Sequence, residues 1–407
     1  MTKKSSTPAI RFKGFTDTWE QRKLGELALF NPKDELPQIF EYVDLESVVG
    51  TEMLSHRTEV KSSAPSRAQR LAHTGDLFYQ TVRPYQKNNY LFERPDNNYV
   101  FSTGYAQMRP YVDGYFLLSL VQSERFVKVV LDNCTGTSYP AINANDLAEI
   151  EVAAPSDESE AQKIGTIFRS IDNLITLHQR KYDKLTNVKK SMLEKMFPKN
   201  GSNVPEIRFK GFTEAWEQRK LGDIVERVVR KNTNNESSLP LTISAQYGLV
   251  DQITYFNNRV ASRDVSNYYL VLNGEFAYNK STSDGFPFGA VKRLDLYEKG
   301  VLSTLYIVFS IKNQSEIDSD YLTVFFDTDR WHKGVSERAA EGARNHGLLN
   351  ISADDFFDID IFLPRHKEEQ VAIGSYLRHL DNLITLHQRE LEKLKNLKKA
   401  CLEKMFV

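Results

Sequence analysis

Two stretches of the chain carry apolar residues at alternating steps of three and four positions, which is the spacing of a coiled-coil seam. One stretch follows Pro155 and the other follows Pro364, and no proline interrupts either for about 40 residues. Each stretch is therefore expected to form one helix, roughly 60 Å long. The positions between carry Lys, Glu, Arg and Gln, as a solvated face does. The predicted seam residues are Ile171, Ile175, Tyr182, Leu185 and Met192 in the first helix, and Leu380, Ile384, Leu391, Leu394 and Cys401 in the second.

Polar residues interrupt the seam at matching places in the two helices. Lys189 and Lys398 occupy seam positions and are expected to fix the register in which the helices pair. His178 and His387 also fall in the seam, without a second ligand at the i+4 spacing of a zinc site, so no metal is expected there. Ser156 is the predicted N-cap of the first helix, because acidic residues follow it near the positive end of the helix dipole.

The stretches that precede the two helices have a different pattern. Short runs rich in β-branched and aromatic residues, such as 98–108 and 300–311, alternate with apolar helical stretches such as 116–131. Each of these stretches is predicted to be an α+β body.

The two halves of the chain are copies of one another. IRFKGFTDTWEQRKLGEL at 10–27 returns as IRFKGFTEAWEQRKLGDI at 207–224, and DNLITLHQR at 172–180 returns letter for letter at 381–389. Between these echoes the matches are faint, and they are mostly apolar, aromatic or turn-forming, whereas the polar residues differ. One scaffold therefore carries two different surfaces.

This repetition predicts the fold class and the domain organisation. We expect two globular α+β domains separated by an intramolecular antiparallel coiled coil of two long helices, an internal duplication with pseudo-twofold symmetry. Homodimerisation through either helix is the alternative. The predicted segments are a lead with the first body (1–155), the first long helix (156–197), a linker with Pro, Gly and Asn (198–206), a lead with the second body (207–364) and the second long helix (365–407).

Composition and charge describe an ordinary globular protein. Of 407 residues, 41% are hydrophobic and 26% are charged, and the formal net charge is -1, so any binding to nucleic acid must rely on local patches. Cys134 and Cys401 are far apart and form no CxxC, which excludes a disulfide framework and fits a reducing cytosol. The first residues lack an apolar signal core, and no apolar run approaches the roughly 20 residues of a membrane helix.

Motifs of catalysis and cofactor binding are absent from the sequence. There is no phosphate-binding G-x-x-x-x-G-K-[ST], no G-x-G-x-x-G and no H-E-x-x-H. We therefore expect no active site in this chain and no cofactor bound to it.

Polar loops recur at matching places in the two bodies and suggest contact with DNA. Residues 57–94 hold seven Lys or Arg against three acidic residues, a local charge of +4. The loops 79–89 and 135–143 correspond to 278–289 and 341–350, which carry a different set of side chains able to bond base edges or phosphates. Tyr79 and Tyr278 occur in both copies and are expected to support the loops. The candidate DNA-binding residues are Lys61, Arg67, Arg70, Gln80, Thr81, Arg83, Gln86, Lys87, Thr137 and Ser138, and in the second body Asn279, Lys280, Ser281, Thr282, Arg344, Asn345 and His346.

Over essentially its full length the chain resembles the specificity subunits of type I restriction–modification enzymes. The resemblance lies in the duplicated DNLITLHQR helices ending in LEKMF, the twin F-K-G-F-T-x-x-W-E-Q-R-K-L-G leads and GTSYPAI. The EEQ that opens the second helix (368–370) is also typical of the family, and the first copy has EAQ (160–162) in its place.

This resemblance implies a DNA-recognition subunit without catalysis of its own. Each body would be a target-recognition domain for one half of a bipartite site in double-stranded DNA, and the coiled coil would set the spacing and dock two modification subunits. S-adenosylmethionine would then belong to the modification partner, and ATP and Mg to a restriction partner, of which two copies are possible. A stand-alone repressor or architectural DNA-binding protein, a fused nuclease or methyltransferase, and a coiled-coil scaffold that never touches DNA are the alternatives.

Overall fold

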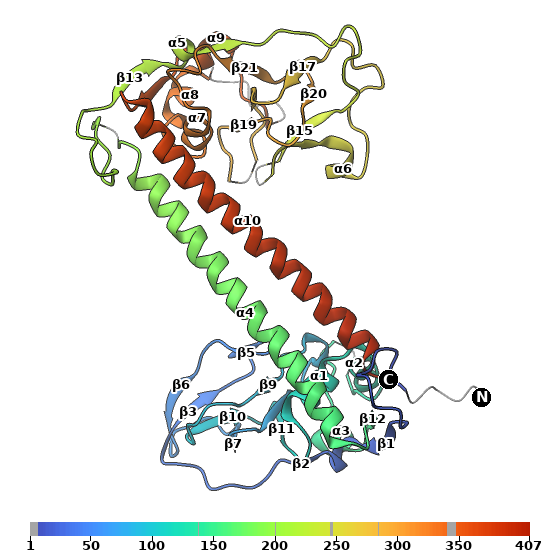
Figure 1. Cartoon of the computed structure of the whole chain (residues 1–407). Coiled ribbons are helices and arrows are strands. Elements are labelled where there is room, and N and C mark those ends of the chain that lie inside the picture. Colours follow the sequence, from blue (N-terminus) through green and yellow to red (C-terminus); the bar gives the residue numbers. More distant parts are fainter. Residues whose placement is uncertain (1–6, 137, 200, 245–246, 284, 340–346) are drawn as a thin grey trace. The chain divides into compact units, whose positions relative to one another are not determined.

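The computed structural model (Figure 1) describes residues 7–136, 138–199, 201–244, 247–283, 285–339 and 347–407. The chain divides into two compact units, Met1–Arg180 with Gln388–Val407 and Lys181–His387. Each unit holds one mixed α and β body, the end of one long helix and the beginning of the other. The predicted α+β class is therefore confirmed for both bodies.

Two four-stranded sheets form the first body. The antiparallel one has the order β2 (Ala28–Phe30), β11 (Tyr105–Pro110), β8 (Leu77–Gln80), β9 (Tyr90–Leu91). The other has the order β6 (Arg57–Val60), β3 (Ile39–Val43), β10 (Tyr99–Ser102), β7 (Ala68–Leu71), with β3 and β10 parallel. The remaining elements are β1 (Glu20–Lys23) paired with β12 (Glu151–Ala154), β4 (Val48–Val49) paired with β5 (Glu52–Met53), and the helices η1 (Leu24–Glu26), η2 (Pro84–Gln86), α1 (Gly114–Gln122), α2 (Glu124–Asp132) and α3 (Ala144–Ala148).

The second body repeats this plan with changes at one side. Its four-stranded antiparallel sheet has the order β14 (Val225–Arg227), β21 (Ile307–Ile311), β18 (Phe276–Asn279), β19 (Ala290–Arg293). Two antiparallel strand pairs replace the other sheet: the consecutive strands β15 (Leu241–Ser244) and β16 (Gly248–Asp251), and the non-consecutive strands β17 (Tyr269–Leu272) and β20 (Lys299–Leu302). The remaining elements are β13 (Glu217–Lys220) paired with β22 (Asp360–Leu363), and the helices α5 (Leu221–Ile224), α6 (Gln252–Phe256), α7 (Ser319–Phe325), α8 (His332–Arg338) and α9 (Ala353–Phe357).

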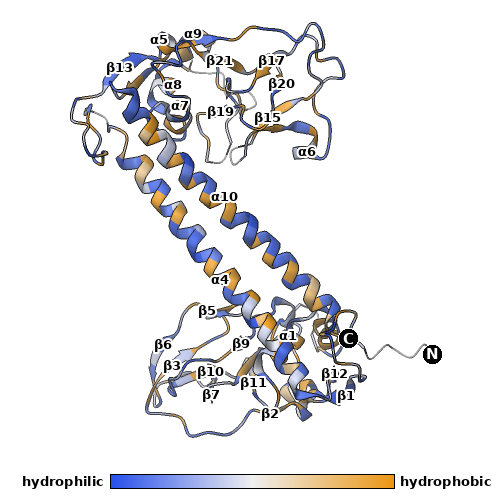
Figure 2. Ribbon diagram, in the orientation of Figure 1, coloured by the Kyte–Doolittle hydropathy of each residue, from blue (hydrophilic) through white to orange (hydrophobic). Residues whose placement is uncertain are grey.

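The two long helices have equal length, α4 (Glu158–Lys195) and α10 (Lys367–Lys404), each of 38 residues. All ten predicted seam residues are buried or half-buried, whereas Leu177 and Leu386 on the opposite face are exposed. Figure 2 shows apolar residues recurring along both helices among hydrophilic ones. The prediction of Ser156 as N-cap was wrong, because α4 begins one residue later than that cap requires. The Asp157 carboxylate accepts a hydrogen bond from the backbone N–H of Ser159, 2.8 Å away, and caps the helix in its place.

Within each unit the beginning of one long helix runs antiparallel to the end of the other. In the first unit the Lys398 ammonium lies 2.7 Å from the Asp172 carboxylate, and in the second unit Lys189 lies 2.6 Å from Asp381. Asp172 and Lys189 are 17 residues apart on α4 (189 less 172), and Asp381 and Lys398 are 17 apart on α10 (398 less 381), so both ion pairs belong to one antiparallel register. The two seam lysines, which were predicted to fix the register, thus each pair with an aspartate on the other helix. Each of these aspartates is the first residue of the repeated DNLITLHQR.

A buried glutamate ties each lead to the first turn of a long helix. The Glu160 side chain is fully buried and accepts two hydrogen bonds from the Arg11 guanidinium, at 2.5 and 2.8 Å, and one from the Trp19 indole at 3.1 Å. Because a buried carboxylate is costly unless it is paired, this bidentate contact holds the lead in place.

The second copy builds the same contact from Arg208, Trp216 and the fully buried Glu369. The equivalent of Glu160 is therefore Glu369 and not Glu368, which matching EAQ with EEQ letter by letter had suggested. Glu368 takes the place of Ser159 on the first helix.

Each lead is also bonded to the end of a long helix. The backbone N–H of Ile207 donates to the Lys195 carbonyl at 2.9 Å, and that of Ile10 donates to the Lys404 carbonyl at 2.9 Å. The first contact joins segments 12 residues apart (207 less 195), whereas the second joins segments 394 residues apart (404 less 10). The same structural joint thus forms between near and between distant parts of the chain.

Inverting the charges of the first register pair tests its role. Asp172→Lys places two ammonium groups together in a largely buried site and should lower the free energy of unfolding by about 1–2 kcal/mol. The double variant Asp172→Lys, Lys398→Asp restores an opposite-charge pair and should recover most of the loss, as measured by chemical denaturation followed by circular dichroism. Glu392→Lys, at an exposed position of α10, is the control and should change stability by less than about 0.5 kcal/mol. A double variant no more stable than the single one would contradict this role.

Candidate nucleic-acid interface

The loop after β8 in the first body is closed by its own amide side chains. The backbone N–H of Gln80 donates to the Asn89 side-chain oxygen at 2.9 Å, and the Gln80 amide donates to the Val82 carbonyl and to Gln86 at 2.6 and 2.9 Å. Arg83 and Lys87 flank η2 with backbone φ angles of 54° and 57°, in the left-handed region. Such angles are unfavourable for residues other than glycine, so the loop bonds must hold them.

This loop lies against the second candidate loop of the same body. The backbone N–H of Arg83 donates to the Pro140 carbonyl at 2.8 Å, and that of Ile142 donates to the Thr81 carbonyl at 3.0 Å. Val82 and Ala141 form an antiparallel bridge between them. The structure thus brings together 79–89 and 135–143, the two polar stretches that the sequence singled out in the first body.

The second body pairs its loops at the equivalent place. The backbone N–H of Thr282 donates to the Gly347 carbonyl at 2.7 Å, and that of Leu349 donates to the Lys280 carbonyl at 3.0 Å. Ser281 and Leu348 form the bridge. The same backbone frame therefore presents different side chains in the two bodies.

The structure divides the candidate residues by exposure. Gln80 and Thr81 are 2% and 8% exposed, and the Thr81 hydroxyl donates to the Gly104 carbonyl at 2.8 Å, so both support the loop from inside. The exposed candidates are Lys61, Arg67, Gln86, Ser138 and Ser281, and the half-buried ones are Arg70, Arg83, Lys87, Asn279, Lys280 and Thr282. Thr137, Arg344, Asn345 and His346 lie outside the described residues.

The four other basic candidates of the first body differ in their distance from the paired loops and in their partners. Arg67 lies near the loops, because its carbonyl accepts a hydrogen bond from the backbone N–H of Thr103, the neighbour of Gly104. Lys61 follows β6, at the opposite edge of the sheet that β7 borders. Arg70 is half-buried on β7, and burial lowers the pKa of its guanidinium. Lys87 is ion-paired with Glu124 at 2.7 Å.

Aromatic residues of the loops take two distinct roles. Tyr79 and Tyr278 are fully buried, as the sequence suggested, and the Tyr278 hydroxyl donates to the Phe288 carbonyl at 2.8 Å. Tyr139, which sequence reasoning did not single out, is 63% exposed and its ring lies under the Arg83 guanidinium. A tyrosine next to proline in a polar loop was the available signal, but sequence alone does not show which cation it meets.

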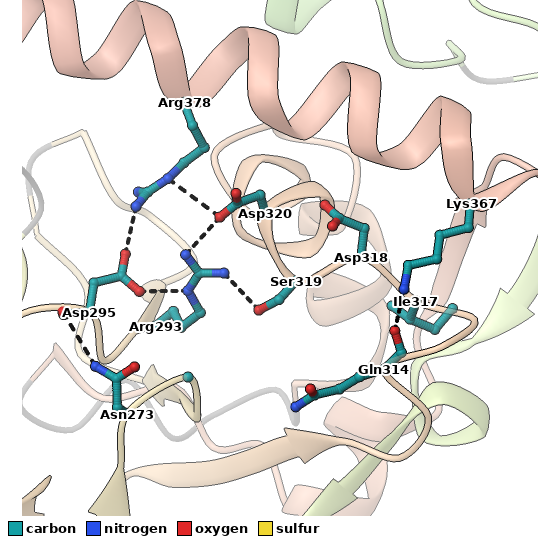
Figure 3. Close-up of a pocket in the computed structure, with 11 residues that line it drawn as sticks. Asn273, Arg293, Asp295, Gln314, Ile317, Asp318, Ser319, Asp320, Lys367 and Arg378 are labelled. Atoms are coloured by element: carbon teal, nitrogen blue, oxygen red, sulfur yellow. Dashed lines mark hydrogen bonds and ion pairs between the residues drawn. The ribbon is translucent and has the colours of Figure 1, made fainter. Parts of the chain in front are cut away.

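A pocket of about 680 Å³ in the second unit is lined by paired charges (Figure 3). The Arg293 guanidinium donates to Asp295 at 2.6 Å and to Asp320 at 2.7 Å, and Arg378 of α10 donates to Asp295 at 2.8 Å. Burial opposes the charge of Arg293, but its bonds to Asp295 and Asp320 raise its pKa above the ordinary value. The pocket wall therefore fastens β19 and α7 to α10.

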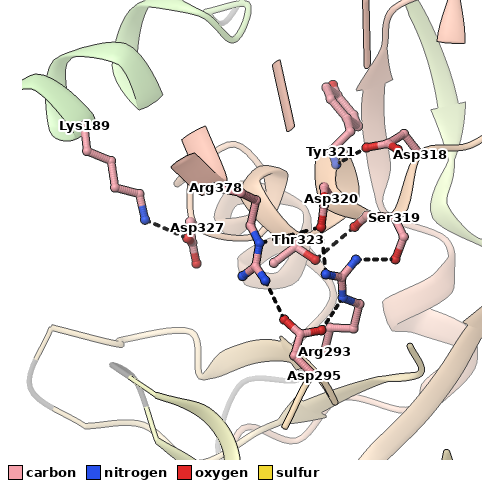
Figure 4. A network of polar contacts seen from close by, with 10 residues as sticks. All are labelled: Lys189, Arg293, Asp295, Asp318, Ser319, Asp320, Tyr321, Thr323, Asp327 and Arg378. Carbon is pink, nitrogen blue, oxygen red and sulfur yellow. Dashed lines mark hydrogen bonds and ion pairs between the residues drawn. The ribbon is translucent and has the colours of Figure 1, made fainter. Parts of the chain in front are cut away.

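A second ionic cluster fastens the same body to α4 (Figure 4). Asp327 lies 3.0 Å from the Lys189 ammonium and 2.7 Å from that of Lys292, and Lys189 also pairs with Asp381 as described above. Burial would raise the pKa of Asp327, but the two lysines lower it below its ordinary value. Lys189 thus belongs both to the contact that fixes the helix register and to an ion-pair cluster of the second body.

The type I restriction modification DNA specificity domain matches the chain twice, at residues 55–187 and 213–396. The chain belongs to the type I restriction–modification DNA specificity family. It is therefore a DNA specificity subunit, and each matched segment contains one body's paired loops and most of a long helix.

Known members of the family are similar over most of the chain. The type I restriction enzyme MjaVIII specificity subunit of Methanocaldococcus jannaschii is 26% identical over 305 residues, which are 70% of this chain and 68% of that protein. The type I restriction–modification S subunit from M. genitalium has the same fold, with a TM-score of 0.65 at 14% identity over 98% of this chain and 99% of that one. The HsdS subunit from Thermoanaerobacter tengcongensis aligns at 20% identity and a TM-score of 0.43, over 95% and 96% of the two chains.

In the parts of the chain that the structure describes, no helix has the length and apolarity needed to cross a bilayer. The polar side chains of the paired loops differ between the two copies, as do other polar residues of the bodies.

Proposed function

We propose that each body reads one half of a bipartite site in double-stranded DNA through its paired loops. The observation that carries this proposal is the recurrence of one loop-pairing frame, at Arg83–Pro140 in the first body and Thr282–Gly347 in the second. Such a frame holds side chains for contact with base edges, and the different side chains suit two different half-sites. The length of the paired helices sets the non-specific gap between them.

We propose that modification subunits dock on an exposed stripe which both long helices share. On α4 the stripe advances by four and three residues, a spacing that keeps it on one face, and on α10 it recurs 209 positions later. Its residues are Asn173, Leu177, Arg180, Lys184 and Asn187, and Asn382, Leu386, Arg389, Lys393 and Asn396, all exposed.

The stripe residues are the same in both helices, and packing within the chain does not explain this because their side chains are exposed. Exposed positions beside the stripe differ between the copies, as Thr186 and Lys395 do. Leu177 and Leu386 are 47% and 51% exposed, so the stripe offers an apolar side chain to a partner at the same place on both helices. Two identical partners would require two identical surfaces.

The chemistry of the complex then resides outside this chain. We infer that the chain binds neither S-adenosylmethionine nor ATP, that the modification subunits supply the former, and that restriction subunits, where present, use the latter with Mg. The complex would act in the cytoplasm, where its DNA lies.

Exchanging the loops tests the assignment of one half-site to each body. Replacing 79–89 should alter the first half of the methylated motif and leave the second half and the gap unchanged, and replacing 278–289 should do the reverse. The readout is methylome sequencing of cells that express the variant with its modification subunit. A replacement in one body that altered both halves would refute the assignment.

Substitutions in the stripe test the docking surface. Leu177→Glu with Leu386→Glu puts charges on the apolar part of the stripe and should weaken co-purification of the modification subunit at least tenfold, since a buried unpaired charge costs several kcal/mol. Thermal unfolding of the isolated chain should change little, because both leucines are exposed. Thr186→Glu with Lys395→Glu, beside the stripe, is the matched control. Undiminished co-purification of the leucine variant would place the partner elsewhere.

A further inference from the structure

Arg83 and Tyr139 join the two loops of the first body through their side chains as well as their backbones. The guanidinium carbon of Arg83 lies 4.4 Å from the centre of the Tyr139 ring, in cation–π contact. The adjacent residue Pro140 accepts the backbone hydrogen bond of Arg83 at 2.8 Å. Both ends of the Arg83 residue are thus fixed against the same short segment.

The charge of Arg83 is not offset by a neighbour on these loops. The sequences 79–89 and 135–143 contain no acidic residue. Lys87, the other cation of the first loop, is paired with Glu124, whereas no ion pair engages Arg83 among the described residues. Arg83 is therefore the cation that this part of the interface offers to an anionic or acceptor-bearing ligand.

The stack determines which part of the guanidinium remains available. Arginine commonly stacks its planar guanidinium on an aromatic face, which leaves the N–H donors pointing outward in the plane. A plane fixed in this way suits a bidentate contact with two acceptors on one edge, such as N7 and O6 of guanine. A phosphate contact needs no such fixed plane, because phosphate presents oxygens in several directions.

The backbone of Arg83 supports the same assignment. Its φ and ψ angles are 54° and 56°, a left-handed conformation that is unfavourable for arginine. The hydrogen bonds of the loop maintain this strained geometry, and strain of this kind gathers where a side chain must be aimed. Among the described residues of the second body's paired loops there is no comparable arginine–aromatic contact.

We propose that Arg83 reads a guanine in the first half-site through N7 and O6, and that Tyr139 is a positioning residue which fixes the plane of the guanidinium. This inference rests on the proposed function of the first body, and it adds the base that one residue selects and the ring that orients it.

The test uses the chain assembled with its modification subunits and a duplex that carries the methylated motif. Competition between duplexes measures discrimination at each base pair of both half-sites. With the unchanged chain, 7-deazaguanine at the contacted position should weaken binding, because it lacks the N7 acceptor. Arg83→Ala should reduce discrimination at that G:C pair roughly 10- to 100-fold and make the complex indifferent to 7-deazaguanine there. Discrimination in the second half-site should not change, which shows that the variant is folded.

The role of the ring is tested by a pair of substitutions. Tyr139→Phe keeps the cation–π contact and should retain discrimination, whereas Tyr139→Leu should reduce it about threefold to tenfold at the same base pair. Tyr111→Leu is the control, since Tyr111 is equally exposed at 63%. A phenylalanine variant as impaired as the leucine variant would overturn the role of the ring.

Other results overturn the assignment of the base. A first half-site without a G:C pair contradicts it outright, and so does an Arg83→Ala variant that loses affinity equally for all sequences, which would show a phosphate contact. If the unchanged chain directs no bipartite methylation at all, the proposed function itself fails, and that outcome is distinct from a failure of Arg83 alone.

Discussion

A lysine in an apolar helix seam must meet a carboxylate, and this requirement governs the rest of the molecule. Lys189 finds Asp381, and Lys398 finds Asp172, each within 2.7 Å. Sliding one helix past the other by a turn would leave both ammonium groups without these partners in a largely apolar contact, which is costly. The ion pairs therefore select one antiparallel register, and every element bonded to the helices takes its position from it.

The bodies are attached to this frame by contacts that are equally duplicated. Glu160 and Glu369 each hold a lead through an arginine and a tryptophan, and the leads in turn bond the helix ends. The second body adds Asp327, which joins the register lysine Lys189 to β19. Residues that repeat in the two halves thus make the contacts between the long helices and the leads, so a change in these contacts would disturb both bodies at once. The loops are free to differ because the hydrogen bonds that pair them are made mainly by their backbones.

The sequence was informative where periodicity and repetition express physical constraints. Helix length, seam positions and the importance of Lys189 and Lys398 follow from a heptad pattern that has few alternatives. The partners of these lysines were less visible, because Asp172 and Asp381 stand just beside the seam, where acids are also common on solvated faces. The EAQ and EEQ letters misaligned the buried glutamates by one residue, since local letters do not show which carboxylate faces the lead. Gln80 and Thr81 looked like contact residues by type, but only the folded loop shows that they close it from inside. Tyr139 acquires its role through a contact with Arg83, 56 residues earlier in the chain (139 less 83), which no local pattern reveals.

The central claim is that one duplicated frame presents two independent readers of DNA. Methylome sequencing of cells that express the unchanged chain with its modification subunit tests it most directly. The account predicts one motif made of two unrelated specific halves, separated by a gap of fixed length in which any sequence is accepted. A continuous motif, or a palindrome whose two halves are the same, would contradict it, because two bodies with different loops on one frame should not read the same sequence.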